Sequence, residues 1–391
     1  MLRLEPEGYF RFVQVDKMTS TFGGGEANVA VSLANYGLDA YYVTKLPKHE
    51  IGQAAINSLR RFGVNTEYIV RGGDRVGIYY NERGASQRGS KCIYDRAHSS
   101  IAEAKPEDFN WTEIFKDCKW FHLTGITPAL GGNMVQICIE ACKAAKAAGA
   151  TVSCDLNYRG KLWTREQARE AMTEIFKDCK WFHLTGITPA LGGNLVQICI
   201  EACKAAKAAG ATVSCDLNYR GKLWTREQAR EAMTQICQYV DVCISNEEDA
   251  KDVFGIEAEN TDITGGKLNK EGYKSVAKQL ADKFGFQKVA ITLRTSINAN
   301  RNNWAALLYD GKDYCFSKEY EMYIVDRVGG GDSFGGGLIY SLLNGKSTQD
   351  AVEFAVAASC LKHTIEGDYN MVSVDEVEKL AAGNGSGRIQ R

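Results

Sequence analysis

The chain has 391 residues, of which 45% are apolar, and its 47 lysines and arginines nearly balance 48 aspartates and glutamates. This composition is typical of a globular protein, and the net charge of −1 gives no reason to expect nucleic acid or an anionic membrane as a partner. No apolar stretch is long enough to span a bilayer and no secretory signal pattern opens the chain, so we expect a cytoplasmic protein with reduced cysteines.

The first hundred residues mix β-rich segments with an α/β pattern. Residues 8–21 and 77–95 are rich in Tyr, Phe and Arg and predict short strands. Together they would form a small β-lid over the carboxyl ends of a main sheet, where open α/β folds bind ligands. An edge β-meander without ligand contact is the alternative. Between these segments, a strand pattern at 41–46 precedes a helix pattern at 52–63.

The middle of the chain contains a tandem repeat. Residues 113–173 recur as residues 174–234 with one difference, Met134 against Leu195, so the 61-residue unit leaves 330 unique residues out of 391. Each copy predicts a βαβα stretch. Two nearly identical copies are too few for a solenoid and favour a recent tandem duplication or an assembly artefact. The fold needs one copy, so the other must bulge out or add strands.

Strand and helix patterns alternate again after the repeat. A strand at 241–246, a helix at 271–285 and a strand at 288–293 are followed by a hairpin signal at Asp310-Gly311. A last strand at 322–326 enters a glycine-rich turn, and helical patterns close the chain. This alternation predicts one α/β domain over residues 1–391, with a mostly parallel sheet covered on both faces.

The most informative motif runs from Asp326 through Gly329, Gly330 and Gly331 to Asp332. A strand ends there, glycines follow, and a helix begins, which exposes backbone N–H groups to an anion. An aspartate inside such a turn is suited to act as general base toward a substrate hydroxyl while the amides hold a phosphoryl group. The alternative is an aspartate that merely caps the helix.

A second glycine-rich helix start lies near the N-terminus, at residues 23–28, and places the amide of Asn28 where it could bind sugar hydroxyls. Other phosphate motifs fail. Gly345-Lys346-Ser347 lacks the first glycine of a P-loop, because position 340 is Tyr340, and instead predicts a helix end followed by a Ser N-cap. No G-x-G-x-x-G stands between a strand and a helix, which argues against a dinucleotide site.

Together, these segments resemble the ribokinase-like (PfkB) carbohydrate kinases. That family has a Gly-Gly-x-x-x-Asn helix start, a D-x-x-G-x-G-D turn and an N-x-x-E segment, for which this chain has NEED at 246–249. The resemblance covers essentially all of the unique sequence. It is greatest to the 2-keto-3-deoxygluconate kinases, on the segments GGGEANVAVSLANYGL, IYYNERGAS, YDRAHSS, LTGITPAL and DLNYRGKLW.

The resemblance implies a three-layer α/β/α sandwich with a small β-lid, carrying the 61-residue βαβα duplication. It implies ATP-dependent phosphorylation of 2-keto-3-deoxygluconate to its 6-phosphate, with Asp332 as base, Gly329–Gly331 as anion hole, and Mg²⁺ and ATP as cofactors. Two alternatives stay open. One is a fructokinase-type or ribokinase-type sugar kinase of the same fold, and the other is a truncated and duplicated chain that binds ligand without turnover.

The resemblance also assigns binding residues. Arg96 shares a strand face with Tyr94, and guanidinium groups suit the carboxylate of a keto-acid because they bind it bidentately. The sugar acid would contact Gly24, Gly25, Glu26, Ala27, Asn28, Tyr79, Tyr94, Arg96, Arg159 or its copy Arg220, and Asp368. The nucleotide would lie along Thr292, Leu293, Arg294, Thr295 and Ser296, with Gly329 and Gly331, and Mg²⁺ would be organised by Asn246 and Asp249.

Three departures from the family pattern matter. Residues 1–4 look like the tail of the apolar strand that opens the family's chains, as though this chain started late. Asp249 stands where the family has Glu, which shortens the reach toward a bound cation. The repeat leaves open whether Arg159 or Arg220 faces the substrate. Exposed lid strands, finally, predict a homo-oligomer.

Overall fold

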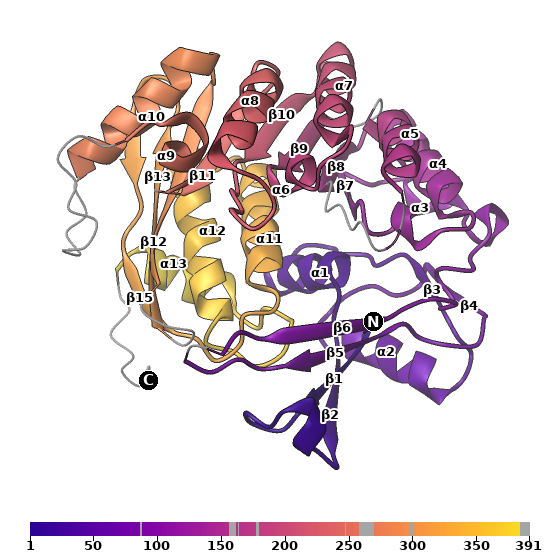
Figure 1. The fold of residues 1–391 in the computed structure, drawn as a ribbon. Coiled ribbons are helices and arrows are strands. Elements are labelled where there is room, and N and C mark those ends of the chain that lie inside the picture. The colour runs from indigo at the N-terminus through magenta and orange to yellow at the C-terminus, as the bar shows by residue number, and fades with distance from the viewer. Residues whose placement is uncertain are drawn as a thin grey trace. The chain divides into compact units, whose positions relative to one another are not determined.

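The computed structural model describes residues 1–86, 88–155, 162, 164–176, 180–246, 248–257, 270–296 and 301–383. The chain divides into two compact units, which the colour bar of Figure 1 helps to trace. The first unit comprises Met1–Glu103, Arg294–Ala306 and Ser317–Arg391, and the second comprises Ala104–Leu293 and Leu307–Phe316.

The first unit contains a four-stranded sheet in the order β2-β1-β5-β6. β1 runs antiparallel to β2 and parallel to β5, and β5 is antiparallel to β6. Residues 77–95 therefore contribute two strands as predicted. Of the predicted segment 8–21, residues 8–17 form a loop with one 3₁₀ turn, and strand pairing begins only at Met18. The strands are β1 (Leu2–Pro6), β2 (Met18–Phe22), β5 (Ile78–Glu82) and β6 (Lys91–Asp95).

One face of this sheet is buried and polar. Side chains alternate between faces along a strand, and β1 buries Arg3 and Glu5 while β5 buries Tyr79 and Asn81. Arg3 stands directly opposite Tyr79 in the register. The apolar residues Leu2, Leu4 and Ile78 are only partly buried, so the usual pattern of apolar residues inside is reversed along these positions.

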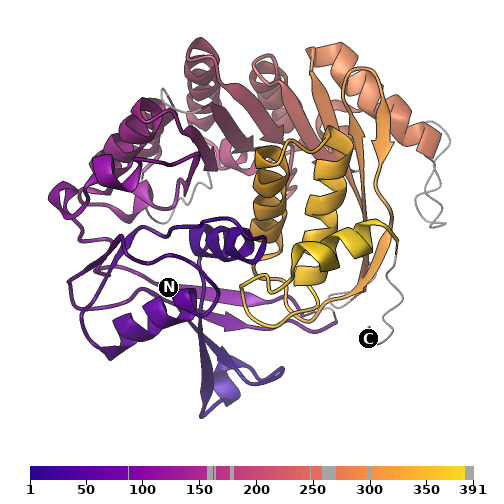
Figure 2. The same cartoon turned by 180° about the vertical axis from the view of Figure 1, so that it is seen from behind.

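The rest of the first unit is mainly helical. Helices α11 and α12 run side by side, drawn in yellow in Figure 2, and α1 packs against α11. The predicted strand at 41–46 and helix at 52–63 are confirmed with shifted ends, as β3 and α2. The elements are α1 (Gly25–Asn35), β3 (Thr44–Leu46), α2 (Glu50–Arg60), β4 (Ile69–Arg71), β15 (Tyr320–Tyr323), α11 (Gly330–Leu343), α12 (Thr348–Lys362) and α13 (Val374–Ala381).

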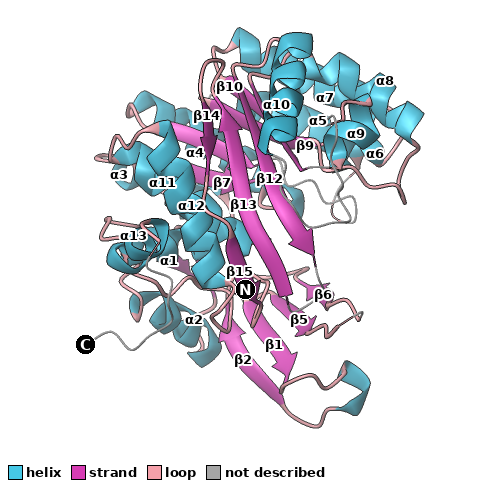
Figure 3. Cartoon of the chain, turned by 90° about the vertical axis from the view of Figure 1, so that its left-hand side faces the viewer, coloured by secondary structure: helices cyan, strands magenta, loops and turns pink. Residues whose placement is uncertain are grey.

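The largest sheet has nine strands in the order β14-β13-β12-β11-β10-β9-β8-β7, and β15 also pairs with β13. The five pairs of neighbouring strands from β7 to β12 are parallel, and β13 is antiparallel to β14 and β15. Figure 3 shows these strands in magenta. Their bounds are β7 (Trp120–Thr124), β8 (Thr151–Asp155), β9 (Trp181–Thr185), β10 (Thr212–Asp216), β11 (Val242–Asn246), β12 (Lys288–Ser296), β13 (Arg301–Tyr309) and β14 (Tyr314–Phe316).

The helices of the second unit connect the parallel strands, as the α/β alternation predicts. Successive helices from α3 to α5 and from α7 to α9 pack against one another, and α5 packs against α7. Their bounds are α3 (Trp111–Ile114), α4 (Met134–Ala147), α5 (Arg165–Phe176), α6 (Ile187–Ala190), α7 (Leu195–Ala208), α8 (Arg226–Cys237), α9 (Asp249–Phe254) and α10 (Lys270–Phe284). None of the helices in the described part of the chain has the length and apolar character to cross a bilayer.

The repeat is accommodated by adding strands. The first copy supplies β7 and β8, the second supplies β9 and β10, and the two pairs have equivalent registers, Trp120↔Thr151 and Trp181↔Thr212. The junction is equivalent as well, because Ser153↔Trp181 between β8 and β9 corresponds to Ser214↔Val242 between β10 and β11. The second copy therefore lies beside β8 as β11 lies beside β10.

Candidate active site

The glycine turn at the start of α11 is held by the carboxylate of Asp326. One of its oxygens accepts the N–H of Val328 at 3.0 Å, and the other accepts that of Gly367 at 3.1 Å. Gly329 follows with φ +82°, and a Cβ there would lie 1.9 Å from the carbonyl oxygen of Asp368. Only glycine fits such a position. A Cβ at Gly331, by contrast, would have no heavy atom within 4 Å, so the helix start is open on that side.

Asp332, in the first turn of α11, is joined to Asn28 of α1. The Asn28 amide donates to the Asp332 carboxylate at 2.7 Å and lies 3.5 Å from Oδ2 of Asp368. Oδ1 of Asn28 in turn accepts the N–H of Gly24 at 3.2 Å. Gly23 has no space for a side chain, because its Cβ would lie 2.3 Å from Asp368 Oδ2. The two glycine motifs of the sequence thus meet at two carboxylates.

Tyr79 and Asp368 extend this cluster toward the four-stranded sheet, called the small sheet below. The Tyr79 hydroxyl donates to Asp368 Oδ2 at 2.6 Å, and burial, with Asp368 next to it, raises the pKa of Tyr79. Tyr94 stands opposite Tyr79 with ring centroids 6.1 Å apart, and the Arg96 guanidinium lies 4.1 Å from the Tyr94 ring centroid. The structure therefore brings together Asn28, Tyr79 and Asp368 with Asp332, and places Tyr94 and Arg96 beside Tyr79.

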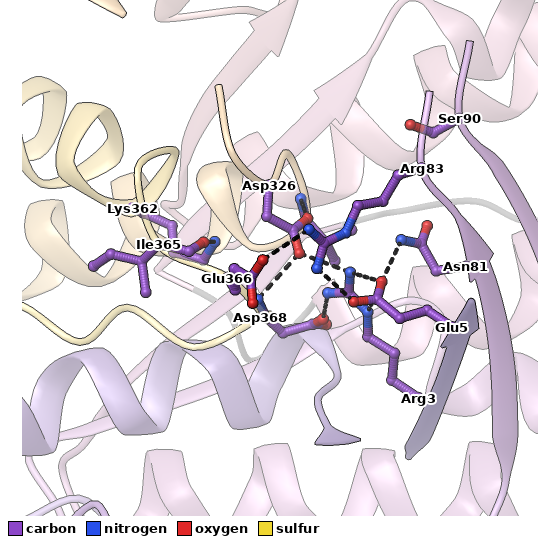
Figure 4. A network of polar contacts seen from close by, with 12 residues as sticks. Arg3, Glu5, Asn81, Arg83, Ser90, Asp326, Lys362, Ile365, Glu366 and Asp368 are labelled. Atoms are coloured by element: carbon purple, nitrogen blue, oxygen red, sulfur yellow. Dashed lines mark hydrogen bonds and ion pairs between the residues drawn. The ribbon is translucent and has the colours of Figure 1, made fainter. Parts of the chain in front are cut away.

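Sequence reasoning missed a buried charge network behind this cluster (Figure 4). Arg3 donates to Asp368 at 2.6 Å and to Asp326 at 2.7 Å, and it also pairs with Glu5. Burial opposes the Arg3 charge, but Asp326, Asp368 and Glu5 raise its pKa. Arg83 continues the network by pairing with Glu5 at 2.6 Å and Glu366 at 3.0 Å.

Lys362, at the end of α12, was also missed. Its side chain is fully buried, its ammonium donates to the carbonyl of Ile365 at 3.1 Å, and its Cε would lie 3.3 Å from a Cβ on Gly329. Burial lowers the pKa of Lys362, while Asp326 and Asp368 act in the opposite direction. A lysine in the last turn of an apolar helix was the only signal in the sequence.

A cavity of about 410 Å³ opens at the edge of this network. Asn81 of β5 lines its wall, with Arg83 just after β5 and Ser90 just before β6, and residues 324–328 form the side next to the glycine turn.

The second unit holds another pair of carboxylates, Asp216 at the end of β10 and Asp249 at the start of α9. Asp249 accepts the N–H of Tyr219 at 2.9 Å. Withdrawal from solvent, and then the charge of Asp249, raise the pKa of Asp216 to about 7, and Arg220 acts against this shift. Hard oxygen donors of this kind suit Mg²⁺. Among the described residues, however, no group of three or more His, Cys, Asp or Glu side chains converges on one point.

The remaining predicted residues within the described part of the chain lie in or beside four elements, α1, β10, β11 and β12. Gly25, Glu26 and Ala27 form the first turn of α1. Asn246 ends β11, Thr292–Ser296 lie in β12, and Leu293 is buried. Of the two repeated arginines, Arg220 follows the strand that pairs with β11, whereas Arg159 lies outside the described residues. The predicted roles in nucleotide, metal and sugar binding stay predictions.

Comparisons with known proteins identify the family of the chain. The model of the pfkB family of carbohydrate kinases matches residues 6–185 and again residues 174–374, so that each match contains one copy of the repeat. A 2-dehydro-3-deoxygalactonokinase of Haloferax volcanii is 28% identical over 389 residues, which are 99% of this chain and 96% of that protein.

Solved structures give the same result. A 2-dehydro-3-deoxygluconokinase from Thermotoga maritima is 45% identical with a TM-score of 0.59, over 98% of this chain and 96% of that one. A pfkB family carbohydrate kinase from Listeria grayi is 29% identical with a TM-score of 0.58, over 98% and 97% of the two chains. The fold and the enzyme class predicted from the two glycine motifs are confirmed, and the chain belongs to the pfkB family of carbohydrate kinases.

Proposed function

We propose that this protein transfers the γ-phosphoryl group of ATP to the 6-hydroxyl of 2-keto-3-deoxygluconate. The observation that carries the proposal is the cluster of Asn28, Tyr79, Asp332 and Asp368 at the open start of α11. It is supported by the 45% identity to a structure named 2-dehydro-3-deoxygluconokinase and by a relative named for the galactonate epimer.

Asp332 is suited to be the general base of this reaction. Its carboxylate would take the proton of the sugar hydroxyl as that oxygen bonds to phosphorus and the bond to the ADP leaving group breaks. The amide of Asn28 fixes one oxygen of the carboxylate at 2.7 Å, so the base is oriented before the substrate binds. General bases of this kind contribute about 10²- to 10⁴-fold to the rate.

The glycine turn would stabilise the charge on the transferring group. Backbone N–H groups at a helix start point toward an anion and need no reorganisation during the reaction. Mg²⁺, when bound, would supply further charge neutralisation, for which Asp216 and Asp249 are suitable oxygen donors.

The sugar acid has two chemically different ends. Asp368, Tyr79 and Asn28 offer acceptors and donors to its hydroxyls. Arg96 or one of the repeated arginines is our choice for its carboxylate, because guanidinium groups bind carboxylates bidentately. We prefer Arg220 to Arg159 because its strand pairs with β11, which leads to Asp249.

The test is a substrate panel with the full chain, ATP and Mg²⁺, in which ADP release is measured. We expect turnover with 2-keto-3-deoxygluconate and less with its galactonate epimer. Phosphorylation of fructose or ribose without the keto-acids would contradict the sugar-acid assignment. Calorimetric binding of ATP and sugar acid without ADP release would instead support a chain that binds ligand without turnover.

A further inference from the structure

Arg3 lies at the centre of the buried network, on the polar face of the small sheet (Figure 4). Its side chain is fully buried and contacts three carboxylates from three parts of the first unit: Glu5 of β1, Asp326 before the glycine turn, and Asp368 after α12. Two of the three, Asp326 and Asp368, belong to the segments that build the proposed site.

The contacts to Asp368 divide its two oxygens. Arg3 donates to Oδ1 at 2.6 Å, while Oδ2 accepts from Tyr79 at 2.6 Å and faces the Asn28 amide at 3.5 Å. A carboxylate held on both oxygens has one orientation. Without Arg3, Asp368 would lose the contact that fixes its rotation about the Cβ–Cγ bond.

The contact to Asp326 acts on the glycine turn. Asp326 Oδ2 accepts from Arg3 at 2.7 Å and from the N–H of Gly367 at 3.1 Å, and Oδ1 accepts the N–H of Val328. Arg3 therefore neutralises the carboxylate that ties the turn to the segment carrying Asp368. A buried carboxylate that loses its cationic partner is strongly destabilised, so these segments would rearrange.

We propose that Arg3 is a positioning residue that sets the orientation of Asp368 for the sugar and of the glycine turn for the phosphoryl group. The proposal rests on the proposed function for its kinetic consequences, while its structural consequence is independent of substrate. Arg3 acts through other residues and is not itself a catalytic group.

Arg83 provides a matched control, because it is the second cation of the same network. It pairs with Glu5 and Glu366, and its replacement leaves the contacts of Asp368 with Arg3, Tyr79 and Asn28 in place. A loss of general stability would follow from either replacement. A change in Asp368 would follow from the loss of Arg3 alone.

The kinetic experiment compares R3M, R3K and R83M in the full chain. We expect R3M to raise KM for the sugar acid and to lower kcat by about 10- to 100-fold, the range expected for small misplacements in an active site. R3K should recover part of the loss, since ammonium keeps the charge but cannot reproduce a planar fork. R83M should change both constants by less than about threefold. An unchanged KM and kcat in folded R3M would overturn the proposal.

The structural experiment needs no activity. In ligand-free crystal structures, the Asp368 carboxylate should turn away from Tyr79 in R3M and keep its place in R83M; R3K takes the place of R3M in both experiments if R3M does not fold. An Asp368 that stays on Tyr79 without Arg3 would refute the positioning role. A wild-type chain without turnover, combined with a displaced Asp368 in the variant, would refute the proposed function and leave the positioning role standing.

Discussion

Asp332 and Asn28 come from helices α11 and α1, and each lies in or next to the first turn of its helix. Their hydrogen bond of 2.7 Å joins the two motifs that carried the sequence-based prediction. Because an asparagine side chain could also accept this hydrogen bond, a D332N variant removes the charge and the basicity while keeping the shape of the site.

Replacement D332N should lower kcat by about 10²- to 10⁴-fold, because the sugar hydroxyl loses its proton acceptor. Affinity for ATP should change little. Steady-state kinetics and calorimetric titration with ATP would measure the two effects. Asp350 offers a matched control in the first turn of α12, and D350N should retain wild-type turnover. Comparable activity of D332N and the wild type would refute the role of Asp332 as base.

The raised pKa of the Asp216 carboxyl leads to a prediction about how the stability of the fold depends on pH. Its pKa rises from 3.8 to about 7 on folding, so the folded protein holds an extra proton between these values and loses stability as the pH rises from 3.8 through about 7. D216N, which cannot ionise, should therefore be more stable than the wild type at pH 8, by about 1–3 kcal/mol, and not at pH 4. Urea unfolding at both pH values, in the presence of EDTA, measures the difference.

The repeat supplies the control for this experiment. Asp155 is the counterpart of Asp216 in the first copy, but its strand is followed in the sheet by β9, whereas that of Asp216 is followed by β11, which leads to Asp249. D155N should not gain stability at pH 8. Equal gains in both variants would show that the proximity of Asp249 is not the cause.

At the residue scale, the sequence revealed side chains that stand next to glycine motifs. Asn28 and Asp332 could be singled out because each stands in the first turn of a helix that begins with glycines, although their roles stay predictions. Arg3 and Glu5 could not, because they alternate with apolar Leu2 and Leu4 and read as part of an apolar strand. Arg3 pairs with Asp326 and Asp368, which lie more than 300 residues away in the sequence. No local sequence pattern encodes such a contact.

Gly335 and Gly336, two of the glycines in helix α11, have different surroundings. A Cβ at Gly336 would lie 2.8 Å from Cβ of Ser32 in α1, whereas one at Gly335 would have no heavy atom within 4 Å. G335A should stabilise the protein by about 0.5–1 kcal/mol, because alanine loses less backbone entropy in a helix. G336A should destabilise it by about 1–3 kcal/mol, because it overpacks the α1–α11 contact. Thermal unfolding of the two variants would measure the difference, and effects of the same sign would contradict it.

Strand ends were harder to predict than strands. Residues 322–326 were predicted as one strand, but β15 ends at Tyr323, and the N–H groups of Val325 and Asp326 bond instead to the carbonyl of His363. The apolar pattern continues because Ile324 is still buried. Burial alone therefore does not distinguish a strand from a segment whose partner is a helix end. The hairpin at Asp310-Gly311 was predicted correctly, since its Asp side chain and a positive φ at Gly311 are local features.

The whole molecule carries a repeat whose two copies supply strand pairs of equivalent register, and this leads to a test by deletion. Removing residues 113–173 or 174–234 gives the same 330-residue sequence apart from Met134 or Leu195. Because β9 pairs with β8 as β11 pairs with β10, the shortened chain can close its sheet with the existing register. We expect it to fold cooperatively, with a thermal midpoint no lower than that of the full chain.

Circular dichroism and thermal unfolding of the two deletion chains would check this expectation, with the two serving as controls for each other. Loss of cooperative unfolding in both would show that the second copy has become necessary to the fold. At this scale the sequence predicted that one copy would add strands or bulge out. It could not decide between them, because the answer depends on the register between strands of different copies.

The equivalent junctions have a geometric consequence. Neighbouring strands lie about 4.8 Å apart and turn by roughly 20–25° relative to each other. The two inserted strands therefore move β7 roughly 10 Å farther from β11 and rotate it by roughly 45°. The loops that leave β7 at Gly125 and β11 at Asn246 are separated by that extra distance along the sheet edge. The number of copies of the repeat therefore sets the length of the sheet edge between β7 and β11. Each further copy would lengthen and twist this edge by the same amount.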